Sequence, residues 1–408
     1  MERAGNSDFR PLRAVFEREL ASVKKQFSLL AAPQRRAIEK NVSGFKKRVS
    51  SMSLLLKKPK EFSRADEMLF AFEELPPFGK EYWFLDFIST EGGSQQQFVL
   101  TFGRSSGEVE VNRRVVRERG GNGGEKECMA IGWHYSRGKK VFAEGTQKVR
   151  ATPAPSPGDE NAITSSSKDF AFSISGNYPN YKMACADGAG REFFKASLTP
   201  PQKGETPFEF ASMSQGIFGF QLVNLYFDFS GELEGKKFSG KCYFQKVLGV
   251  GPFVPWRWAR CVFQNGSVME FFEMTAPTPA FLPKKSLDSW YSFQKPGQKR
   301  ETTYGKIKID KIEPLPGRSA RWVASSGDGR AFLEASAYAE HTFSFETKAT
   351  GKFVYEEHFA NARDFFFLEK SKSAAGAKAK GIAKPALQSL QKTGSGVCLF
   401  EDAYGFLL

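Results

Sequence analysis

The sequence predicts a mainly β protein in which two consecutive antiparallel β-barrels follow an N-terminal α-helical segment. The first observation is the recurrence of apolar residues at every second position in many short stretches, which indicates half-buried strands. The second is the spacing of these stretches, roughly 8–12 residues, with Gly and Pro at many joins, which is typical of sandwiches and barrels. The third is their number, because about sixteen to eighteen strands exceed the about eight to ten of one small barrel.

The predicted helical segment covers residues 1–62. Apolar residues recur there every three or four positions within 8–57, and Lys and Arg fill the other faces. Pro33 interrupts the pattern at a place suited to the first turn of a second helix. The pattern fits a helical hairpin docked on the body, a basic amphipathic element that touches a membrane surface or a partner, or a cleaved targeting segment.

The predicted first barrel covers residues 63–236, since the apolar period changes from 3.6 to 2 near its start. Strands are expected at 82–88 and 97–102, with Glu91-Gly92-Gly93 between them, and further strands follow as far as residue 198. The glycine-rich run at 117–126 opens no recognisable helix, so we do not expect it to bind phosphate.

The predicted second barrel covers residues 237–408 and includes a basic Lys/Ala-rich insertion at 370–392. The boundary is placed in the glycine-rich stretch from Gly231 to Gly240, where one meander ends and the next begins. Asn265-Gly266 is a strong tight-hairpin signal. Between these points, residues 249–258 are expected to form an aromatic loop through which the two barrels pack.

The net charge of +14 is concentrated outside the predicted barrels. Residues 1–62 carry 15 Lys and Arg against 6 Asp and Glu, and residues 370–392 carry 6 Lys and no acid. A folded nucleic-acid-binding face would place the basic residues within the domain, so nucleic acid is not an expected partner. Attraction of the N-terminal segment to an anionic membrane surface fits this distribution better.

The few cysteines and histidines restrict the chemistry. The chain has 5 Cys, widely spaced and without a CxxC motif, which argues against a disulfide scaffold and for a reducing compartment. Its 3 His show no metal-ligand spacing, so neither a metal nor another cofactor is expected. We find no signal peptide and no membrane-spanning apolar run, so the expected location is cytoplasmic, with peripheral contact to a membrane through residues 1–62.

Two segments resemble a known family. Residues 231–244 read GELEGKKFSGKCYF, followed by Trp256-Arg257-Trp258 and by a strand that ends in Asn265-Gly266; residues 394–405 read GSGVCLFEDAYG. These segments, about 60 residues in all, resemble the double-lipocalin family of AttH-like proteins and carotenoid hydratases, also called hydroxyneurosporene synthases. The resemblance implies two lipocalin-like barrels with a nonpolar cavity inside a barrel for lipid or isoprenoid-like ligands.

One departure from the family concerns catalysis. Where the hydratases carry an acidic residue after the Gly-Tyr position, this chain has Gln245 and Lys246. Protonation of a double bond needs a positioned acid. We therefore assign no catalytic residue and do not carry the hydratase activity over.

The candidate ligand-binding residues are Tyr243, Gln245, Trp256, Trp258, Glu401 and Tyr404. The two tryptophans stand two positions apart and share one side of an extended segment, where they would either plug the joint between the barrels or line a ligand mouth. Tyr243 and Gln245 likewise share a face, directed either into a cavity or outward. Glu401 matches the glutamate of the family motif and would be either a paired structural carboxylate or a ligand contact.

The predicted function is the binding of a hydrophobic small molecule, such as a lipid or an isoprenoid. An isoprenoid hydratase or cyclase is the alternative. Such an enzyme would need an acid inside the cavity, and Glu401 and Asp402 are the first candidates. A second alternative is a structural or interaction protein with filled barrels. The sequence does not indicate an oligomeric state.

Overall fold

The computed structural model describes residues 65–407 apart from 76–77, 92–95, 118–123, 137, 155, 157, 216–217, 252, 276–285, 313, 315–318, 348–350 and 369–393. The predicted helical segment at 1–62 and the basic insertion at 370–392 therefore lie outside the described residues. Within the described part of the chain, no helix has both the length and the apolar character needed to span a membrane.

The first sheet is a closed antiparallel barrel. Its strands in spatial order begin with β10, β9, β8, β7, β6 and β5 and continue through β2, β1, β13, β12 and β11. A further ladder between β10 and β12 closes the ring. Gly231 permits this closure, because a Cβ there would lie 1.9 Å from the carbonyl oxygen of Lys195 on β10. The bounds are β1 Gly79–Ser89, β2 Gln97–Ser105, β5 Glu125–Ser136, β6 Lys139–Thr152, β7 Asn161–Ser166, β8 Phe170–Asn177, β9 Asn180–Asp187, β10 Glu192–Thr199, β11 Phe208–Gln215, β12 Phe218–Leu233 and β13 Lys236–Val250.

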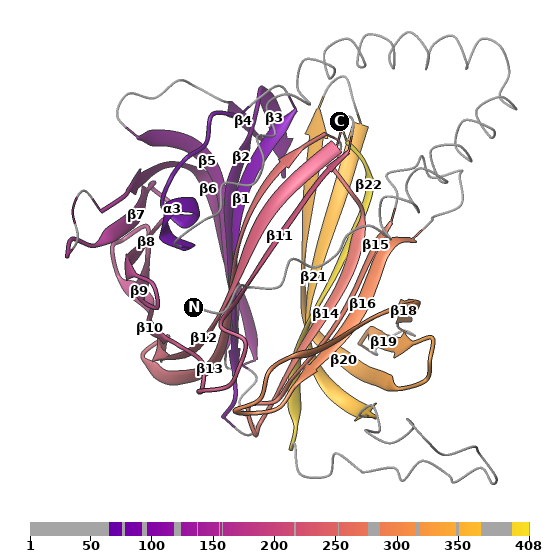
Figure 1. The fold of residues 1–408 in the computed structure, drawn as a ribbon. Helices are drawn as coiled ribbons and strands as arrows, with labels where there is room; N and C mark the ends of the chain where they lie inside the picture. The colour runs from indigo at the N-terminus through magenta and orange to yellow at the C-terminus, as the bar shows by residue number, and fades with distance from the viewer. Residues whose placement is uncertain are drawn as a thin grey trace, which may run out of the picture.

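The second sheet is also antiparallel and lies beside the first (Figure 1). Its order is β17, β16, β15, β14, β22, β21, β20, β19 and β18, and β18 lies near β15 and β16, so the sheet curls into an open barrel. The predicted fold class is thus confirmed. The bounds are β14 Trp256–Phe263, β15 Val268–Thr275, β16 Ser286–Gln294, β17 Glu301–Tyr304, β18 Ile307–Ile312, β19 Arg321–Ser326, β20 Ala331–Thr347, β21 Gly351–Phe367 and β22 Gly396–Phe406.

One hairpin from the first half of the chain belongs to the second sheet. β3 (Glu108–Val111) and β4 (Arg114–Arg117) pair with each other, and β3 then pairs with β20. Asn112, between the two short strands, donates its backbone N–H to Ser344 O at 2.9 Å, and its side-chain Oδ1 accepts from the backbone N–H of Ser344 at 2.8 Å. The hairpin therefore ties the two sheets together through backbone hydrogen bonds.

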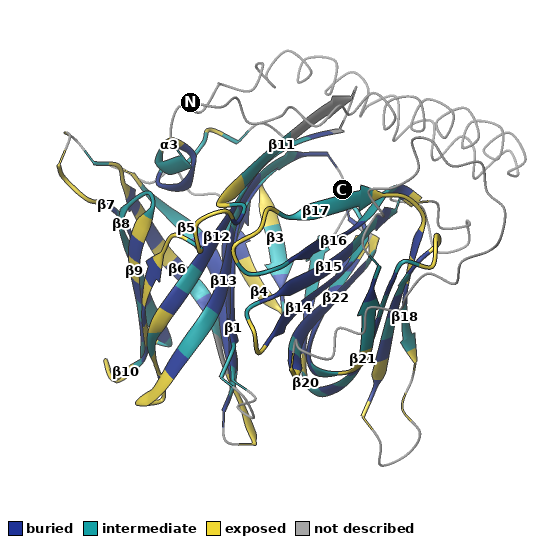
Figure 2. Cartoon of the chain, turned by 60° about the horizontal axis from the view of Figure 1, so that its bottom comes forward, coloured by how far each residue is buried: buried dark blue, intermediate teal, exposed yellow. Residues whose placement is uncertain are grey.

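The described residues form three apolar clusters. The alternation of buried and exposed residues along the strands of the first barrel (Figure 2) directs one set of side chains inward, where Phe87 meets Phe98, Phe194 and Phe229. A short helix, α3 (Ala65–Leu69), packs against this cluster. A second cluster fills the second sheet. The third lies between the sheets, where Trp133 and Phe359 stack with their ring centroids 3.6 Å apart.

The structure moves the boundary between the barrels. The glycine-rich stretch from Gly231 to Gly240 holds the β12–β13 hairpin, whose turn residues Glu234 and Gly235 both have positive φ, at 54° and 67°. Such a turn matches the twist of the two flanking strands and keeps them in one sheet. The chain changes sheets only after Val250, so the predicted boundary between 236 and 237 falls inside the first barrel.

The expected aromatic loop at 249–258 is also shorter than predicted. Trp256 begins β14, and Trp256 and Trp258 are paired with β15 and β22 on either side. The two tryptophans thus belong to a strand in the middle of the second sheet. The hairpin predicted at Asn265-Gly266 does join β14 to β15, with Gly266 at a φ of 84°.

Candidate functional site

A cavity of about 650 Å³ lies between the two sheets. One wall is the outer face of β1, β11, β12 and β13, and the other comes from β14, β15, β16, β21 and β22. The cavity was expected inside a barrel, but the barrel interiors hold the apolar clusters, and the outward-facing side chains line the space between the sheets. Most of the lining is aromatic or aliphatic: Phe84, Tyr243, Val247, Phe253, Trp256, Trp258, Phe272, Met274, Trp290, Phe353 and Tyr355.

Five of the six candidate residues line this cavity. Period-two geometry explains the grouping, because Tyr243 and Gln245 share the outer face of β13, and Trp256 and Trp258 share one face of β14. Glu401 lies beside Trp258 in the ladder between β14 and β22. The remaining candidate, Tyr404 (also on β22), is not among the lining residues, and its hydroxyl donates to Glu356 Oε1 at 2.9 Å.

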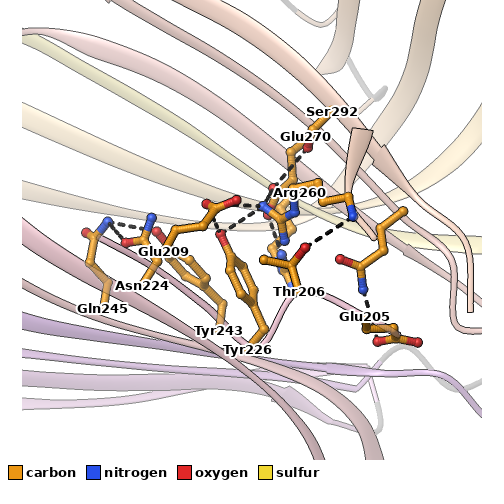
Figure 3. Close-up of polar contacts among 12 residues, drawn as sticks. Glu205, Thr206, Glu209, Asn224, Tyr226, Tyr243, Gln245, Arg260, Glu270 and Ser292 are labelled. Atoms are coloured by element: carbon orange, nitrogen blue, oxygen red, sulfur yellow. Dashed lines mark hydrogen bonds and ion pairs between the residues drawn. The ribbon is translucent and has the colours of Figure 1, made fainter. Parts of the chain in front are cut away.

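A hydrogen-bonded polar row crosses the wall formed by the first barrel (Figure 3). Gln245 Nε2 donates to Asn224 Oδ1 at 2.9 Å and to the Tyr243 hydroxyl oxygen at 2.7 Å. Both amide side chains come from neighbouring strands, β12 and β13, which are paired at Asn224 and Gln245. The row gives the cavity hydrogen-bonding groups without a net charge.

A charged cluster crosses from one sheet to the other. Glu270 on β15 accepts hydrogen bonds from Arg260 and from Arg300, and Arg300 Nη1 also donates to the Tyr226 hydroxyl oxygen at 2.8 Å. That hydroxyl in turn donates to Glu209 Oε2 at 2.8 Å (Figure 3). Arg300, Tyr226 and Glu209 were not predicted from the sequence. Arg260 could have been found from the sequence, because it is a charged residue in the middle of an otherwise largely apolar strand.

The Glu401 carboxyl faces the cavity without a cationic partner among the described residues. Trp256 Nε1 donates to its Oε2 at 2.8 Å. Burial raises the pKa of Glu401 to about 7, although hydrogen bonds from Tyr355 and Trp256 act in the opposite direction. Near neutral pH this carboxyl can therefore both hold and release a proton.

Two more buried carboxyls lie close to Glu401. Glu357 on β21 stands opposite Glu401 in the ladder, and Trp133 Nε1 donates to it. Burial, helped by the charge of Glu401, raises the pKa of Glu357 to about 8. Asp86 on β1 is fully buried, and burial raises its pKa to about 8 although the Arg260 guanidinium acts against it.

Lys246 belongs to the interior of the first barrel and does not face the cavity. Its ammonium is fully buried, 2.8 Å from a carboxylate oxygen of Glu81, and it donates to the carbonyl oxygens of Met68 and Ala71 at 2.6 and 2.5 Å. Burial lowers the pKa of Lys246. This lysine fastens the α3 segment over the barrel, which gives the departure from the family motif a structural role.

The described residues contain no group of three or more His, Cys, Asp or Glu that could hold a metal ion. His134 lies 3.1 Å from Glu234, and burial lowers its pKa. All five cysteines are buried and unpaired. The polar chemistry of the cavity thus rests on carboxyls, arginines, the Lys80 ammonium, amides and phenols.

No protein-family model matches the sequence, and a search of curated proteins found no match. Among solved structures, one from Nitrosomonas europaea, provisionally described as an AttH, is similar at 11% sequence identity. The match covers 86% of this chain and 98% of that chain, with a TM-score of 0.45. Membership of the double-lipocalin family therefore stays a prediction.

Proposed function

We propose that this protein binds a hydrophobic small molecule, of a lipid or isoprenoid-like class, in the cavity between its two sheets. The observation that carries the proposal is the cavity itself, whose volume of about 650 Å³ lies within the roughly 300–1,000 Å³ of small-molecule sites. Its mostly apolar lining with a few convergent polar groups is also the usual composition of such sites.

Removal of apolar surface from water supplies the affinity. A ligand that buries about 300 Å² of apolar surface gains about 7 kcal/mol at about 25 cal/mol per Å². Loss of translational and rotational freedom opposes this gain, so the net affinity is smaller. The amide row of Asn224 and Gln245 would orient one polar group of the ligand by hydrogen bonding.

Native mass spectrometry of the purified protein, followed by organic extraction, tests the proposal. The expected result is a co-purifying hydrophobic molecule that is lost from Val247→Trp, because Val247 lines the cavity and is 7% exposed. Val141→Trp is the matched control, since Val141 is 45% exposed and does not line the cavity. Absence of a bound molecule, together with no uptake of added lipid or isoprenoid, would contradict the proposal.

An isoprenoid hydratase or cyclase is the second candidate function, and Glu401 favours it. A proton donor for a carbon–carbon double bond must face an apolar site and hold a proton near neutral pH. Glu401 lines the cavity, and its pKa is raised to about 7. A protein with filled barrels and no ligand is the weaker alternative, because the cavity between the sheets has no role in it.

We further propose that an anionic membrane surface is a partner through residues 1–62, with the protein located in the cytoplasm and peripheral to that membrane. The support is the basic, amphipathic composition of this segment, which lies outside the described residues.

A further inference from the structure

Two buried carboxylates lie directly opposite each other at one wall of the cavity. Glu357 and Glu401 form a cross-strand pair of β21 and β22 and are 0% and 5% exposed. Like charges directly opposite on neighbouring strands are destabilising, and burial removes most of the water that would screen them. The pair therefore requires either a proton or a nearby cation.

Among the residues that the structure describes, no cationic side chain pairs with Glu357 or Glu401. Among the described residues, the groups that hydrogen-bond to it are neutral: the indoles of Trp133 and Trp256 and the phenol of Tyr355. Asp86, from the facing sheet, adds a third buried carboxyl, and neither of its oxygens has a hydrogen-bond partner. The site thus concentrates carboxyl groups beside an apolar cavity.

The nearby arginines already share a carboxylate partner. Arg260 and Arg300 both pair with Glu270, and the closest approach of Arg260 to Asp86 is 3.8 Å. This part of the structure therefore holds two buried arginines and four buried carboxyls, which are those of Asp86, Glu270, Glu357 and Glu401. An anionic ligand would meet Arg300, which already pairs with Glu270, and Lys80, whose ammonium already donates to Gly251 O at 2.7 Å. Beside Glu401 it would add to the excess of carboxyl groups.

Aromatic side chains lie beside Glu401: the Trp256 indole and the Tyr355 phenol hydrogen-bond to its carboxyl, and Trp258 is its partner in the ladder. The rings of Trp256 and Tyr355 lie 5.5 Å apart, and those of Trp258 and Tyr243 lie 5.2 Å apart. Aromatic faces attract a cation, most strongly where water is excluded. We propose that the preferred ligand is a hydrophobic amine whose cationic nitrogen lies beside Glu401, among the rings of Trp256, Trp258 and Tyr355. This inference rests on the proposed function and narrows its ligand class.

The pH dependence follows from the ionisation of the carboxyls. With pKa values raised to about 7 for Glu401 and about 8 for Glu357, these groups hold protons at pH 6 and lose them toward pH 9. An alkylamine stays protonated over this range, as Lys does. Amine binding should therefore strengthen as pH rises and release protons at pH 7. The titratable groups around Glu401 are Tyr82, Asp86, Tyr243, Tyr355 and Glu357, with Arg260 and Glu270 acting on Asp86.

Isothermal titration calorimetry of the full-length protein with decylamine, decanol and decanoate tests the inference. At pH 8.5 decylamine should bind at least about tenfold more tightly than decanol, with decanoate weakest. Lowering the pH to 6 should weaken the binding of decylamine and leave the affinity for decanol unchanged. Repeating the titration at pH 7 in buffers of different ionisation enthalpy measures the released protons.

Two variants locate the amine. Glu401→Gln should lower the affinity for decylamine at least about tenfold and change the affinity for decanol less than about threefold. Asp402→Asn is the control, because Asp402 pairs with Arg257 at 3.1 Å and does not line the cavity. The inference is overturned, with the proposed function intact, if decanol or decanoate binds the wild type as tightly as decylamine does. If none of the three ligands binds, both fail.

Discussion

Replacement of Glu270 by Gln removes a carboxylate that two buried arginines, Arg260 and Arg300, share. Glu270 is 1% exposed, and the side chains of Arg260 and Arg300 are 2% and 3% exposed. After Glu270→Gln, the nearest carboxylate oxygens are those of Asp86, 3.8 Å from Arg260, and Glu209, 3.9 Å from Arg300. Both arginines would remain buried and poorly paired.

The size of the effect follows from the charges. One ion pair at about 4 Å is worth about 4 kcal/mol at an effective dielectric constant of about 20. Glu270 makes two such pairs, and the remaining carboxylates recover part of the loss, so the cost should be that of breaking a buried pair, about 3–5 kcal/mol. Because the cluster joins β15 to β12 and β11, the contact between the sheets should weaken.

Urea denaturation, followed by tryptophan fluorescence and circular dichroism, measures the free energy of unfolding. Glu108→Gln is the control, because Glu108 pairs with Arg117 at 2.7 Å on the surface, where both side chains are about half exposed. Water and salt screen such an exposed pair, so its loss should change the free energy of unfolding much less than loss of Glu270 does. If Glu270→Gln destabilises the protein no more than Glu108→Gln does, the pairing of Glu270 with the two buried arginines does not stabilise the fold as predicted.

Two further predictions concern activity and membrane contact. If the protein is a hydratase or cyclase, Glu401→Gln should lower turnover of an isoprenoid substrate about 100-fold or more, as loss of a general acid does, whereas unchanged turnover in product analysis would exclude Glu401 as the proton donor. Deletion of residues 1–60 should abolish sedimentation with anionic liposomes, because this segment carries an excess of Lys and Arg. Equal pelleting of the truncated and full-length proteins would contradict that role.

Local patterns were sufficient to predict the strands and part of the site. Period-two spacing places Tyr243 with Gln245 and Trp256 with Trp258, and each pair does line the cavity. The same rule applies to Tyr404, which is three positions from Glu401 and therefore lies on the opposite face of β22. Strand alternation thus separates two residues that were both candidate ligand contacts.

Contacts between the sheets could not be predicted in the same way. Arg300 meets Tyr226 and Glu270 only because β12 and β15 face each other across the cavity. Nothing in the local sequence around Arg300 specifies those partners. The position of the cavity was missed for the same reason, since alternation shows that a strand has two faces but not which face a second sheet will cover.

The β3–β4 hairpin has a consequence for synthesis of the chain. Asn112 and Ser344, which join it to β20, are 232 residues apart, so the hairpin emerges from the ribosome long before its partner strand. At about 5–20 residues per second, the unpaired edge of β3 waits for about 10–50 s. Once Val250 has been made, the completed first barrel exposes the outer face that will later line the cavity until the second sheet forms. A nascent chain of this protein should therefore depend on chaperones until β20 is made.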